Sequence, residues 1–350
     1  MRDISVIICT HNPRPNYLLR VLTALRSQTL PREQWELVLV DNASPVRLAD
    51  KWDLSWHPRG RIVREEEIGI TPARLRGITE TKGSLLVFVD DDNVLVEDYL
   101  EHVSAIATEF PHVGVFGAGV LEPEFEVKPE PVVQARQHLL ALRTVERAFW
   151  SNNPKDYHCG PFGAGICVPR FIAVRFVELV HALEISSVLG RRGKSLFCGE
   201  DDLFYWLCSN TESGFGIFPE LQITHLIPAV RVQQDYMVQL VYSHTFSHAI
   251  LDYKIKGKKP SAGADFLVFR NLAHGLKHGW FSMRCRFAEM RGVSDAVQFI
   301  REHKLEVLPP DKCPFFHAPE QPGDSNPAIV VEKGREKLTT GSVFPRAHSN

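Results

Sequence analysis

The first hundred residues contain three short apolar runs, at residues 4–9, 37–40 and 85–89. None of these runs alternates with polar residues, which predicts strands that are buried on both faces. Between the runs, apolar residues recur at helical spacing. Strands and helices in this alternating order predict an α/β fold, with a mainly parallel sheet covered by helices on both faces.

Three helices are expected in this part of the chain. Apolar residues at helical spacing predict the first over residues 18–25, with Asn16 as its N-cap. Thr71 followed by Pro72 predicts the N-cap and first position of a second helix. The third is expected from about residue 96 to residue 109.

Beyond residue 110 the pattern is less regular. Residues 111–160 are rich in Pro, Glu and aromatic residues and lack a clear period, as expected of a segment that faces a substrate. Short strands are predicted at 166–168 and 221–224, and helices between 230 and 300.

The pattern divides the chain into three parts. We expect an α/β domain over residues 1–228, with halves at about 1–110 and 111–228. A helical extension is expected over 229–308. Residues 309–350 are rich in proline and poor in large apolar residues, which predicts a disordered tail.

The composition narrows the class of protein. Hydrophobic residues make up 44% of the 350 residues, enough for a sizeable core. The 40 basic and 42 acidic residues give a net charge of −2, so nucleic acid is not an expected partner. The 7 cysteines are scattered and form no C-x-x-C pair, which argues against a zinc cluster or a disulfide scaffold and favours a reducing compartment.

Membrane insertion is not expected from the sequence. No stretch approaches the roughly 18 uninterrupted apolar residues of a spanning helix. The first apolar run is too short for the core of a signal peptide. We therefore expect a cytoplasmic protein, and the sequence leaves open a peripheral association with the inner face of the membrane.

Three consecutive carboxylates, Asp90, Asp91 and Asp92, directly follow the third apolar run. They repel one another, which lowers stability unless a cation offsets their charge. Mg²⁺ and Mn²⁺ prefer oxygen ligands and are often held by one or two carboxylates together with diphosphate oxygens. Because ligands of such sheets bind outside the carboxyl ends of the strands, we favour a metal site over an exposed acidic turn.

Two further positions have both a binding and a structural interpretation. Asp41 ends the second run and could accept a hydrogen bond from a uracil or a ribose, or it could merely cap a turn with Asn42 and Ser44. Arg74 lies in the first turn of a predicted helix, where backbone N–H groups favour anions, and Arg74 or Arg76 could approach a diphosphate. The alternative for Arg74 is a solvated helix face.

The acidic run Glu200-Asp201-Asp202 precedes an apolar helix at 203–207. A carboxylate beside a bound sugar could act as a general base toward an acceptor hydroxyl. Acidic residues at a helix start are also explained by the helix dipole alone. Both explanations stay open at this point.

Histidines supply the last candidates. His225 follows a strand-like segment, and a neutral imidazole can complete the ligand set of a metal, with a structural histidine as the alternative. His244 and His248 lie four residues apart on a predicted helix. We interpret that pair as part of the core or the surface, with metal binding as the remote alternative.

In this order, these residues resemble the family 2 glycosyltransferases of the GT-A fold. The matching segments are 5–12, 39–44, 69–77, 87–92, 163–165, 199–202 and His225. The resemblance implies transfer of a sugar from a nucleotide-diphosphate sugar, a UDP-sugar above all, to an acceptor hydroxyl, with inversion and with Mg²⁺ or Mn²⁺ as cofactor. The Gln-x-x-Arg-Trp signature and membrane helices of processive members are missing, which favours a single addition.

The resemblance also implies a role for each matching residue. Nucleotide-sugar binding falls to Thr10, His11, Asn12, Asp41, Arg74, Asp90 and Asp91. Metal binding falls to Asp92, Asp90 and His225. Asp201 matches the catalytic base, with Glu200 and Asp202 as alternatives, and the acceptor sugar would be bordered by Phe162, Gly163, Ala164 and Gly165. The family's Ala-Arg-Asn-x-Gly departs here at Leu75, which replaces the Asn.

The loop after the first run, Thr10 to Pro13, argues against two competing classes of enzyme. A nucleotidyltransferase would carry a Gly-rich, basic loop there, and a dehydrogenase would carry G-x-G-x-x-G. The alternative that stays open is a catalytically inactive sugar-nucleotide-binding or scaffolding protein, because fold alone does not settle activity. The expected partners are the donor and a glycan or glycolipid acceptor, in cell-surface polysaccharide or glycolipid assembly.

Overall fold

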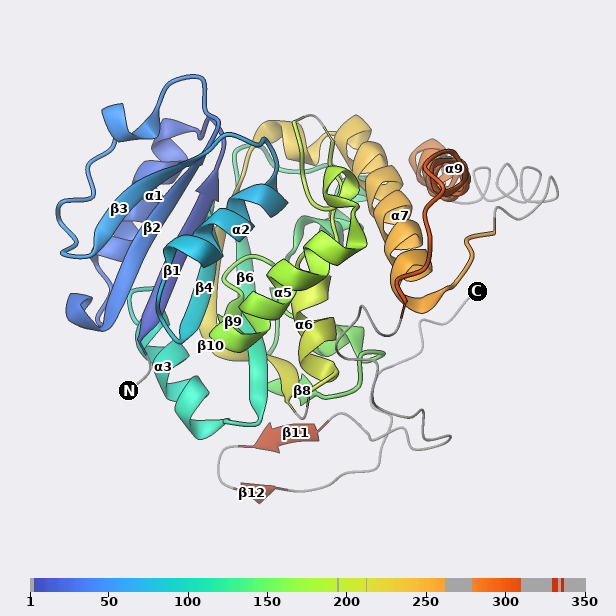
Figure 1. Cartoon of the computed structure of the whole chain (residues 1–350). Coiled ribbons are helices and arrows are strands. Elements are labelled where there is room, and N and C mark those ends of the chain that lie inside the picture. Colours follow the sequence, from blue (N-terminus) through green and yellow to red (C-terminus); the bar gives the residue numbers. More distant parts are fainter. Residues whose placement is uncertain are drawn as a thin grey trace.

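The computed structural model describes residues 3–193, 195–211, 213–261 and 279–309, and the backbone of residues 329–332 and 335–336. A mixed sheet forms the centre of the molecule, in the order β12-β11-β8-β10-β6-β9-β4-β1-β2-β3 (Figure 1). The strands are β1 (Ile4–Thr10), β2 (Trp35–Asn42), β3 (Gly60–Glu65), β4 (Leu85–Asp90), β5 (Asn93–Leu95), β6 (Val113–Phe125), β7 (Arg143–Thr144), β8 (Phe149–Ser151), β9 (Cys167–Pro169), β10 (Gly214–Ile227), β11 (Ile329–Glu332) and β12 (Arg335–Glu336). The α-helices are α1 (Pro15–Arg26), α2 (Ile70–Glu80), α3 (Tyr99–Glu109), α4 (Pro131–Gln134), α5 (Arg170–Leu183), α6 (Asp202–Ser209), α7 (Gln234–Lys256) and α9 (Trp280–Glu302).

The three apolar runs form adjacent parallel strands, as predicted. β1 pairs in parallel with both β2 and β4, and every residue of β1 and β2 is buried. Alternate side chains point to opposite faces. Val6 and Leu37 pack on the side of α1 and α3, whereas Ile7 and Val38 pack on the side of α2, α5 and α6. The α/β fold with helices on both faces is therefore confirmed, and the antiparallel strand β9 beside β4 makes the sheet mixed.

Two of the expected helix caps are wrong. Helix α1 begins at Pro15, so Asn16 lies inside it, and proline suits this first position because its missing N–H would have no partner there. Helix α2 begins at Ile70 after Gly69, whose φ of 144° only glycine adopts readily. The Thr71 hydroxyl instead donates to the carbonyl of Leu189, at 2.6 Å. A tertiary contact therefore replaces the predicted cap.

Strand β6 and helix α5 are two elements that the sequence analysis did not predict. The first seven residues of β6 are buried and three of its last six are exposed, so no single period marks the strand. Two of its glycines permit close approach of other chain segments. A Cβ at Gly117 would lie 2.8 Å from Pro161 Cβ, and one at Gly119 would lie 2.6 Å from the backbone of Phe218. The absence of side chains there lets β6 pack inside the sheet.

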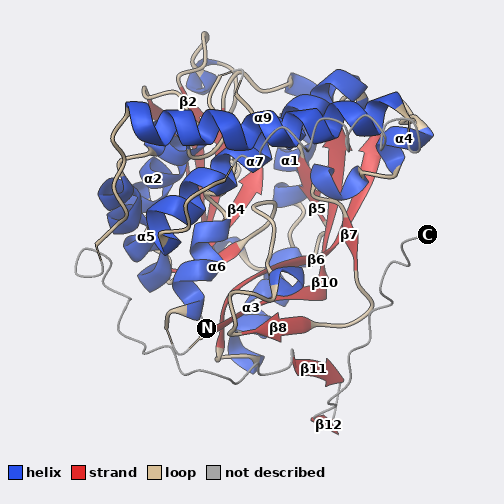
Figure 2. Cartoon of the chain, turned by 90° about the vertical axis from the view of Figure 1, so that its right-hand side faces the viewer, coloured by secondary structure: helices blue, strands red, loops and turns tan. Residues whose placement is uncertain are grey.

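In the part of the chain that the structure describes, the expected helical extension contains two long helices, α7 and α9, which lie side by side. Their first turns form a separate apolar cluster with α4 and the end of β10, whereas Phe246 and Ala296 of their later turns belong to the main core. Figure 2 shows α9 crossing one end of the molecule. A Cβ at Gly292 of α9 would lie 2.8 Å from the carbonyl oxygen of Tyr242 on α7, so the helix backbones approach closely. The Tyr242 hydroxyl donates to Asp295, at 2.9 Å.

The predicted disordered tail lies outside the described residues, apart from residue 309 and the two short strands. Of these, β11 pairs antiparallel with β8 at Ile329↔Trp150 and Val330↔Phe149. Among the helices of the described residues, none has both the length and the hydropathy that crossing a bilayer requires.

His57 is a buried titratable group in the β2–β3 connection, 2% exposed. Its ring centroid lies 4.1 Å from that of Trp35 and 5.5 Å from that of Trp56. The Arg59 N–H donates to its Nδ1, at 3.2 Å, so the neutral ring fits the site. Burial, together with the charges of Arg32 and Arg59, lowers the pKa of His57 to about 4.

We expect His57 to make the free energy of unfolding fall as the pH falls from 6.5 to about 4. Over that range the unfolded chain binds a proton that the folded chain excludes, so protonation favours unfolding. His57→Asn keeps an acceptor and does not titrate, so its stability should depend less steeply on pH. Urea denaturation over this pH range measures the difference. An equal pH dependence in His57→Asn, the exposed control His181→Asn and the wild type would contradict the assignment.

Candidate active site

The acidic run lies at the end of β4, at the carboxyl edge of the parallel strands. Asp92 is buried, and Asp90 and Asp91 are half-buried. The hydroxyl of Thr10, at the end of β1, donates to Asp91. Burial and the charge of Asp92 raise the pKa of Asp90, and the same causes raise the pKa of Asp91 to about 7. The repulsion expected within this run is therefore present.

Asp92 faces a cation that the sequence analysis did not single out, Arg231. Arg231 Nη1 lies 2.9 Å from Asp92 Oδ2 and 3.1 Å from His225 Nε2. His225 Nε2 is itself 3.7 Å from Asp92 Oδ2, so the predicted metal ligands Asp92 and His225 do converge. Burial acts to raise the pKa of Asp92, but Arg231 and His225 outweigh it and hold the pKa well below its usual range.

The end of β2 carries Asp41, whose two oxygens are both engaged. They accept hydrogen bonds from the N–H groups of Ser44 and Leu48, each at 3.0 Å, and from Arg64 Nη1 at 2.8 Å. Burial acts to raise the pKa of Asp41, but these donors lower it overall. These contacts are those expected if Asp41 caps a turn. The carboxylate thereby holds the shape of the loop at this edge.

The loops after β1 and β2 are tied together next to Asp41. His11 Nδ1 lies 2.6 Å from the carbonyl oxygen of Asn42, and the Asn12 N–H donates to Ser44 Oγ at 2.9 Å. The Asn42 side chain accepts from the Gly69 N–H, at 2.8 Å, which joins the start of α2 to the same edge. Asn12 has a positive φ of 47°, a conformation that persists only where the surroundings hold it.

Arg74 is buried beside Glu200, which contradicts the solvated helix face as its environment. Arg74 is 3% exposed, and its Nη1 lies 3.3 Å from Glu200 Oε1. Burial acts to lower the pKa of Arg74, but the charges of Glu200, Asp90 and Asp201 raise it overall. Burial raises the pKa of Glu200 to about 7 against the effect of Arg74. One guanidinium thus lies within electrostatic reach of both acidic runs.

The predicted base and the predicted acceptor segment are in contact. Asp201 Oδ2 accepts the Gly163 N–H, at 2.9 Å. A Cβ at Gly163 would lie 2.6 Å from Arg74 Nη2 and 3.2 Å from Asp201 Oδ2, so glycine is required for this approach. Asp202 contacts a different part of the chain, with its Oδ2 3.4 Å from His248 Nε2 on α7. Burial and the charge of Asp201 raise the pKa of Asp202 to about 7.

A cavity of about 520 Å³ opens next to these carboxylates. Its walls come from the segment before β9, from α6 and from α7, and they include Phe162, Asp202, His244 and His248. The Arg143 guanidinium lies over the Phe162 ring, 4.1 Å from its centroid, and donates to the Gly160 carbonyl. The wall thus combines aromatic faces with titratable groups, a combination suited to a sugar and its hydroxyls.

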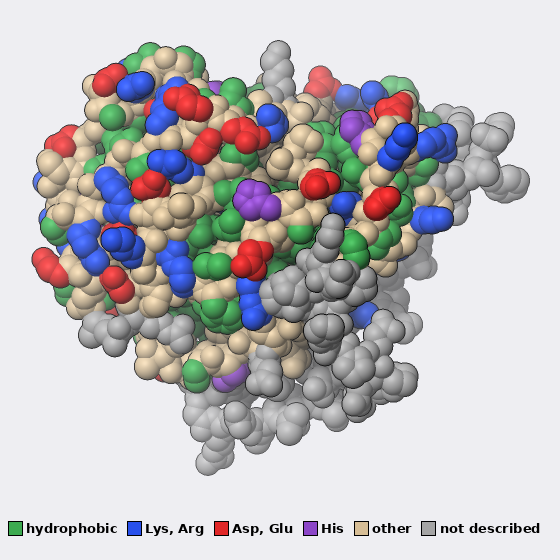
Figure 3. Space-filling view, in the orientation of Figure 1, with side chains coloured by type: hydrophobic (Ala, Val, Ile, Leu, Met, Phe, Trp, Pro, Cys, Tyr) green, Lys and Arg blue, Asp and Glu red, His purple; other side chains and the backbone are tan. Residues whose placement is uncertain are grey.

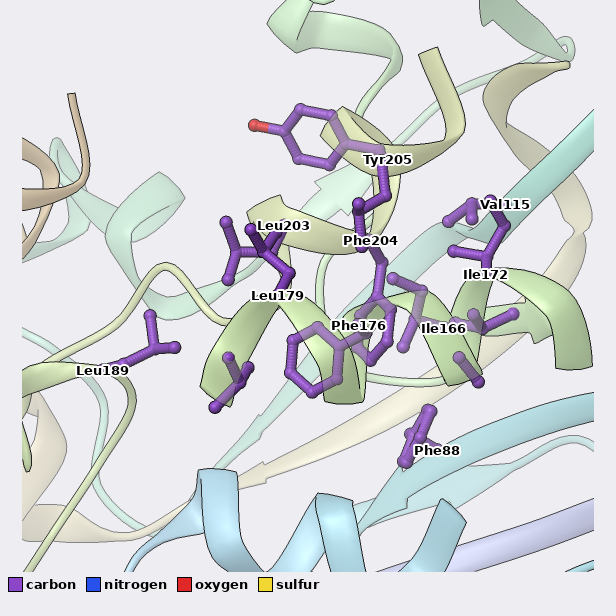
Figure 4. Close-up of a cluster of buried hydrophobic side chains, with 14 of the residues drawn as sticks. Phe88, Val115, Ile166, Ile172, Phe176, Leu179, Leu189, Leu203, Phe204 and Tyr205 are labelled. Atoms are coloured by element: carbon purple, nitrogen blue, oxygen red, sulfur yellow. The ribbon is translucent and has the colours of Figure 1, made fainter. Parts of the chain in front are cut away.

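Helix α6, which follows Asp201, is anchored in the core by aromatic rings (Figure 4). Phe204 stacks on Phe176 of α5, with ring centroids 4.2 Å apart, and on Phe88 of β4 at 5.5 Å. Phe88 precedes the acidic run by two residues, so both acidic runs are attached to one packed cluster. Rigid support of this kind fixes the relative positions of the two runs.

The structure gathers most of the predicted residues around Arg74 and Arg231. Arg231 was missed because it lies in a single turn after β10, and only its spacing of six residues after His225 marks it in the sequence. On the face drawn in Figure 3, acidic and basic side chains are interspersed.

Part of the chain matches the sequence profile of a known protein family. Residues 5–176 match the sequence profile of Glycosyl transferase family 2. This part of the chain therefore belongs to the family, as the resemblance predicted, and the α/β sheet flanked by helices agrees with the fold expected for it.

Individual relatives are more distant. The chain is 32% identical over 108 residues to glycosyltransferase AglE of Haloferax volcanii, covering 30% of this chain and 35% of the relative. It is 36% identical over 91 residues to dolichol-phosphate mannosyltransferase of Pyrococcus furiosus, covering 25% of each. The matched segments thus span about a third or less of these relatives. The crystal structure of S. aureus TarS 1-349 is similar with a TM-score of 0.45 and 13% identity, over 86% of this chain and 92% of that one.

Removing the Arg231 charge should destabilise the protein and make it more responsive to divalent cations. Arg231→Met leaves Asp92 buried without its cation, which we expect to cost roughly 3 kcal/mol of unfolding free energy. Mn²⁺ should then raise the melting temperature of Arg231→Met by more than it raises that of the wild type. Thermal unfolding with and without Mn²⁺ measures both effects. Arg231→Lys, which keeps the charge, is the matched control. Equal Mn²⁺ responses in the wild type, Arg231→Met and Arg231→Lys would contradict a role for Arg231 where a cation binds.

Proposed function

We propose that this protein is a glycosyltransferase that moves a sugar from a nucleotide-diphosphate sugar, most specifically a UDP-sugar, to a hydroxyl of a glycan or glycolipid. The observation that carries the proposal is the arrangement around Arg74. Its guanidinium lies within electrostatic reach of Asp90 at the sheet edge and contacts Glu200, and it approaches Gly163 beside Asp201. A donor diphosphate at the edge and an acceptor hydroxyl in the cavity would thus meet between the two acidic runs.

The donor would occupy the carboxyl edge of β1, β2 and β4. Thr10, His11 and Asn12 form the loop over that edge, and Asp41 holds the opposite turn in shape. Asp90 and Asp91 have raised pKa values, so each gains from a neighbouring positive charge or from a hydroxyl donor such as a ribose. Arg74 would share the charge of the diphosphate.

The residues at Asp92 fit a divalent cation. A carboxylate oxygen of Asp92 and the imidazole of His225 are suitable donors for Mg²⁺ or Mn²⁺, and Asp90 would add a second carboxylate after its side chain turns toward them. Asp92 Oδ2 and His225 Nε2 already lie 3.7 Å apart, and Arg231 now supplies positive charge to both. A cation bound there would offset the charge that develops on the departing nucleoside diphosphate. The Arg231 side chain would move aside to admit it.

Asp201 is the proposed general base. Its Oδ2 accepts the Gly163 N–H, which orients the carboxylate toward the segment that borders the acceptor. The acceptor hydroxyl would lose its proton to Asp201 while its oxygen attacks the anomeric carbon from the face opposite the diphosphate. This geometry gives inversion of configuration. Phe162, Gly163, Ala164 and Gly165 would border the acceptor, and Phe162 also lines the cavity.

The proposed setting of the reaction is the assembly of a cell-surface polysaccharide or glycolipid. A single transfer to a cell-surface polysaccharide or a lipid-linked acceptor, at the cytoplasmic face of a membrane, suits a family 2 enzyme without processive signatures. A relative acts, by its name, on dolichol phosphate, which is a lipid-linked acceptor. A catalytically inactive sugar-nucleotide-binding protein is the second candidate. Metal-dependent hydrolysis or transfer of a UDP-sugar separates the two.

We expect Asp201→Asn to lower the turnover number by about 10²–10⁴-fold, the usual contribution of a general base. Donor affinity should change little, because the amide keeps the shape of the carboxylate and one acceptor oxygen. Steady-state kinetics with a panel of UDP-sugars, together with calorimetric donor binding, measure the two quantities. Asp202→Asn is the matched neighbour and should retain most of the turnover. The reverse ranking of the two variants would move the role of base to Asp202.

Asp92→Ala should weaken the binding of the nucleoside diphosphate in the presence of Mn²⁺ and leave its weaker metal-free binding nearly unchanged. The physical reason is that the variant removes a cation ligand and not a direct donor contact. Isothermal titration of UDP with Mn²⁺ and with chelator gives the comparison. A loss of the same size in both conditions would mean that Asp92 acts without a metal.

A further inference from the structure

A second group of possible metal ligands lies on the wall of the cavity, away from the acidic run of β4. It consists of Cys198, in the loop that leads to Asp201, and His244 and His248, one turn apart on α7. The ligand atoms of these three residues lie within 4.8 Å of one another. The two imidazole Nε2 atoms are 3.2 Å apart.

These distances fit a tetrahedral transition-metal site. Zn²⁺ binds imidazole nitrogen at about 2.0–2.1 Å and thiolate sulfur at about 2.3 Å, so ligand atoms of a tetrahedral site lie about 3.3–3.6 Å apart. The Nε2–Nε2 distance is already close to this range, and small side-chain rotations would bring the sulfur into it. One thiolate with two imidazoles is a donor set that Zn²⁺ prefers and Mg²⁺ does not.

A fourth ligand is at hand in Asp202. Its Oδ2 lies 3.4 Å from His248 Nε2, on the same side of the cavity. Two other contacts hold the loop against α7 before any ion binds. The Cys198 N–H donates to Ser247 Oγ at 3.2 Å, and a Cβ at Gly199 would lie 2.4 Å from Leu251 Cδ1. The backbone is therefore already positioned for a site of this kind.

An ordinary hydrogen bond is the alternative explanation of the histidine pair. Two neutral imidazoles can share one proton between their Nε2 atoms, and residues four apart on a helix meet without any ligand. That explanation leaves the approach of Cys198 to both imidazoles, and of Asp202 to His248, to chance. A metal accounts for these approaches together.

We propose that Cys198, His244 and His248, completed by Asp202, form a Zn²⁺ site that fastens the 198–202 loop to α7. The site is separate from the cation site at Asp92. The site also has a consequence for the transfer reaction, and this consequence rests on the proposed function. A carboxylate that ligates zinc is a poor proton acceptor, so the site would exclude Asp202 as the base and leave that role to Asp201.

Metal content and spectroscopy test the site without any assay of transfer. The full chain, stripped with chelator and dialysed against Zn²⁺, should retain a stoichiometric zinc ion. Cys198→Ser and His248→Gln should each bind Zn²⁺ at least about tenfold more weakly, in competition with a chromophoric chelator. Co²⁺ should give a thiolate-to-metal absorption band that Cys198→Ser abolishes. Circular dichroism verifies that the variants fold.

Two control variants separate this site from the others. His181→Gln, at an exposed histidine of α5, should bind zinc as the wild type does. Asp92→Ala should also keep its zinc while losing Mn²⁺-dependent UDP binding. A wild-type chain that retains no zinc, or a zinc ion lost in Asp92→Ala and kept in Cys198→Ser, would overturn the proposal. Because zinc binding is measured directly, failure of the transferase proposal would leave this result unaffected.

Discussion

The structure depends on holding several carboxylates close together at one edge of a sheet, where burial and mutual repulsion oppose their ionisation. Asp90, Asp91 and Asp92 end β4, and Glu200 lies opposite them beside Arg74. Two guanidiniums, the buried Arg74 and the half-buried Arg231, make this concentration of negative charge tolerable. Removing either cation would leave charge buried without a partner. The two guanidiniums thus supply positive charge in the region where a bound metal or ligand would interact with the carboxylates.

The supporting structure explains how such a site stays in shape. The apolar faces of β1, β2 and β4 are packed on both sides, so the strand ends are fixed to one another. Phe204, stacked between Phe88 and Phe176, fixes α6 to the same core. Glycine at 163 allows the loop before β9 to reach Arg74 and Asp201 together. The acidic side chains are therefore positioned by packing and by backbone approach more than by their own attractions, which are mostly unfavourable.

Helix α7 connects this site to the extension. It lies against the loop that carries Cys198 and Gly199, contributes two histidines to the cavity wall, and packs on α9 along its other side. The cavity is thus closed by an element outside the segment that matches the family, which covers residues 5–176. In this arrangement the family domain would determine the chemistry of the donor, and the extension would shape the space offered to the acceptor.

The sequence by itself determined the parallel strands and the acidic turn that follows β4, because uninterrupted apolar runs and clustered carboxylates are local patterns. It also predicted that Asp92 and His225 belong together, through the resemblance to the family. It did not determine β6, whose burial changes along its length, or the caps of α1 and α2, where Gly69 and a hydrogen bond from Thr71 to Leu189 decide the geometry. The cation that faces Asp92, and the partners of Arg74 and Cys198, were decided only by the tertiary structure. Arg231, Glu200 and His248 are distant or unremarkable in the sequence, and only the packing of β10, α6 and α7 against the sheet brings their charges and donor atoms into reach.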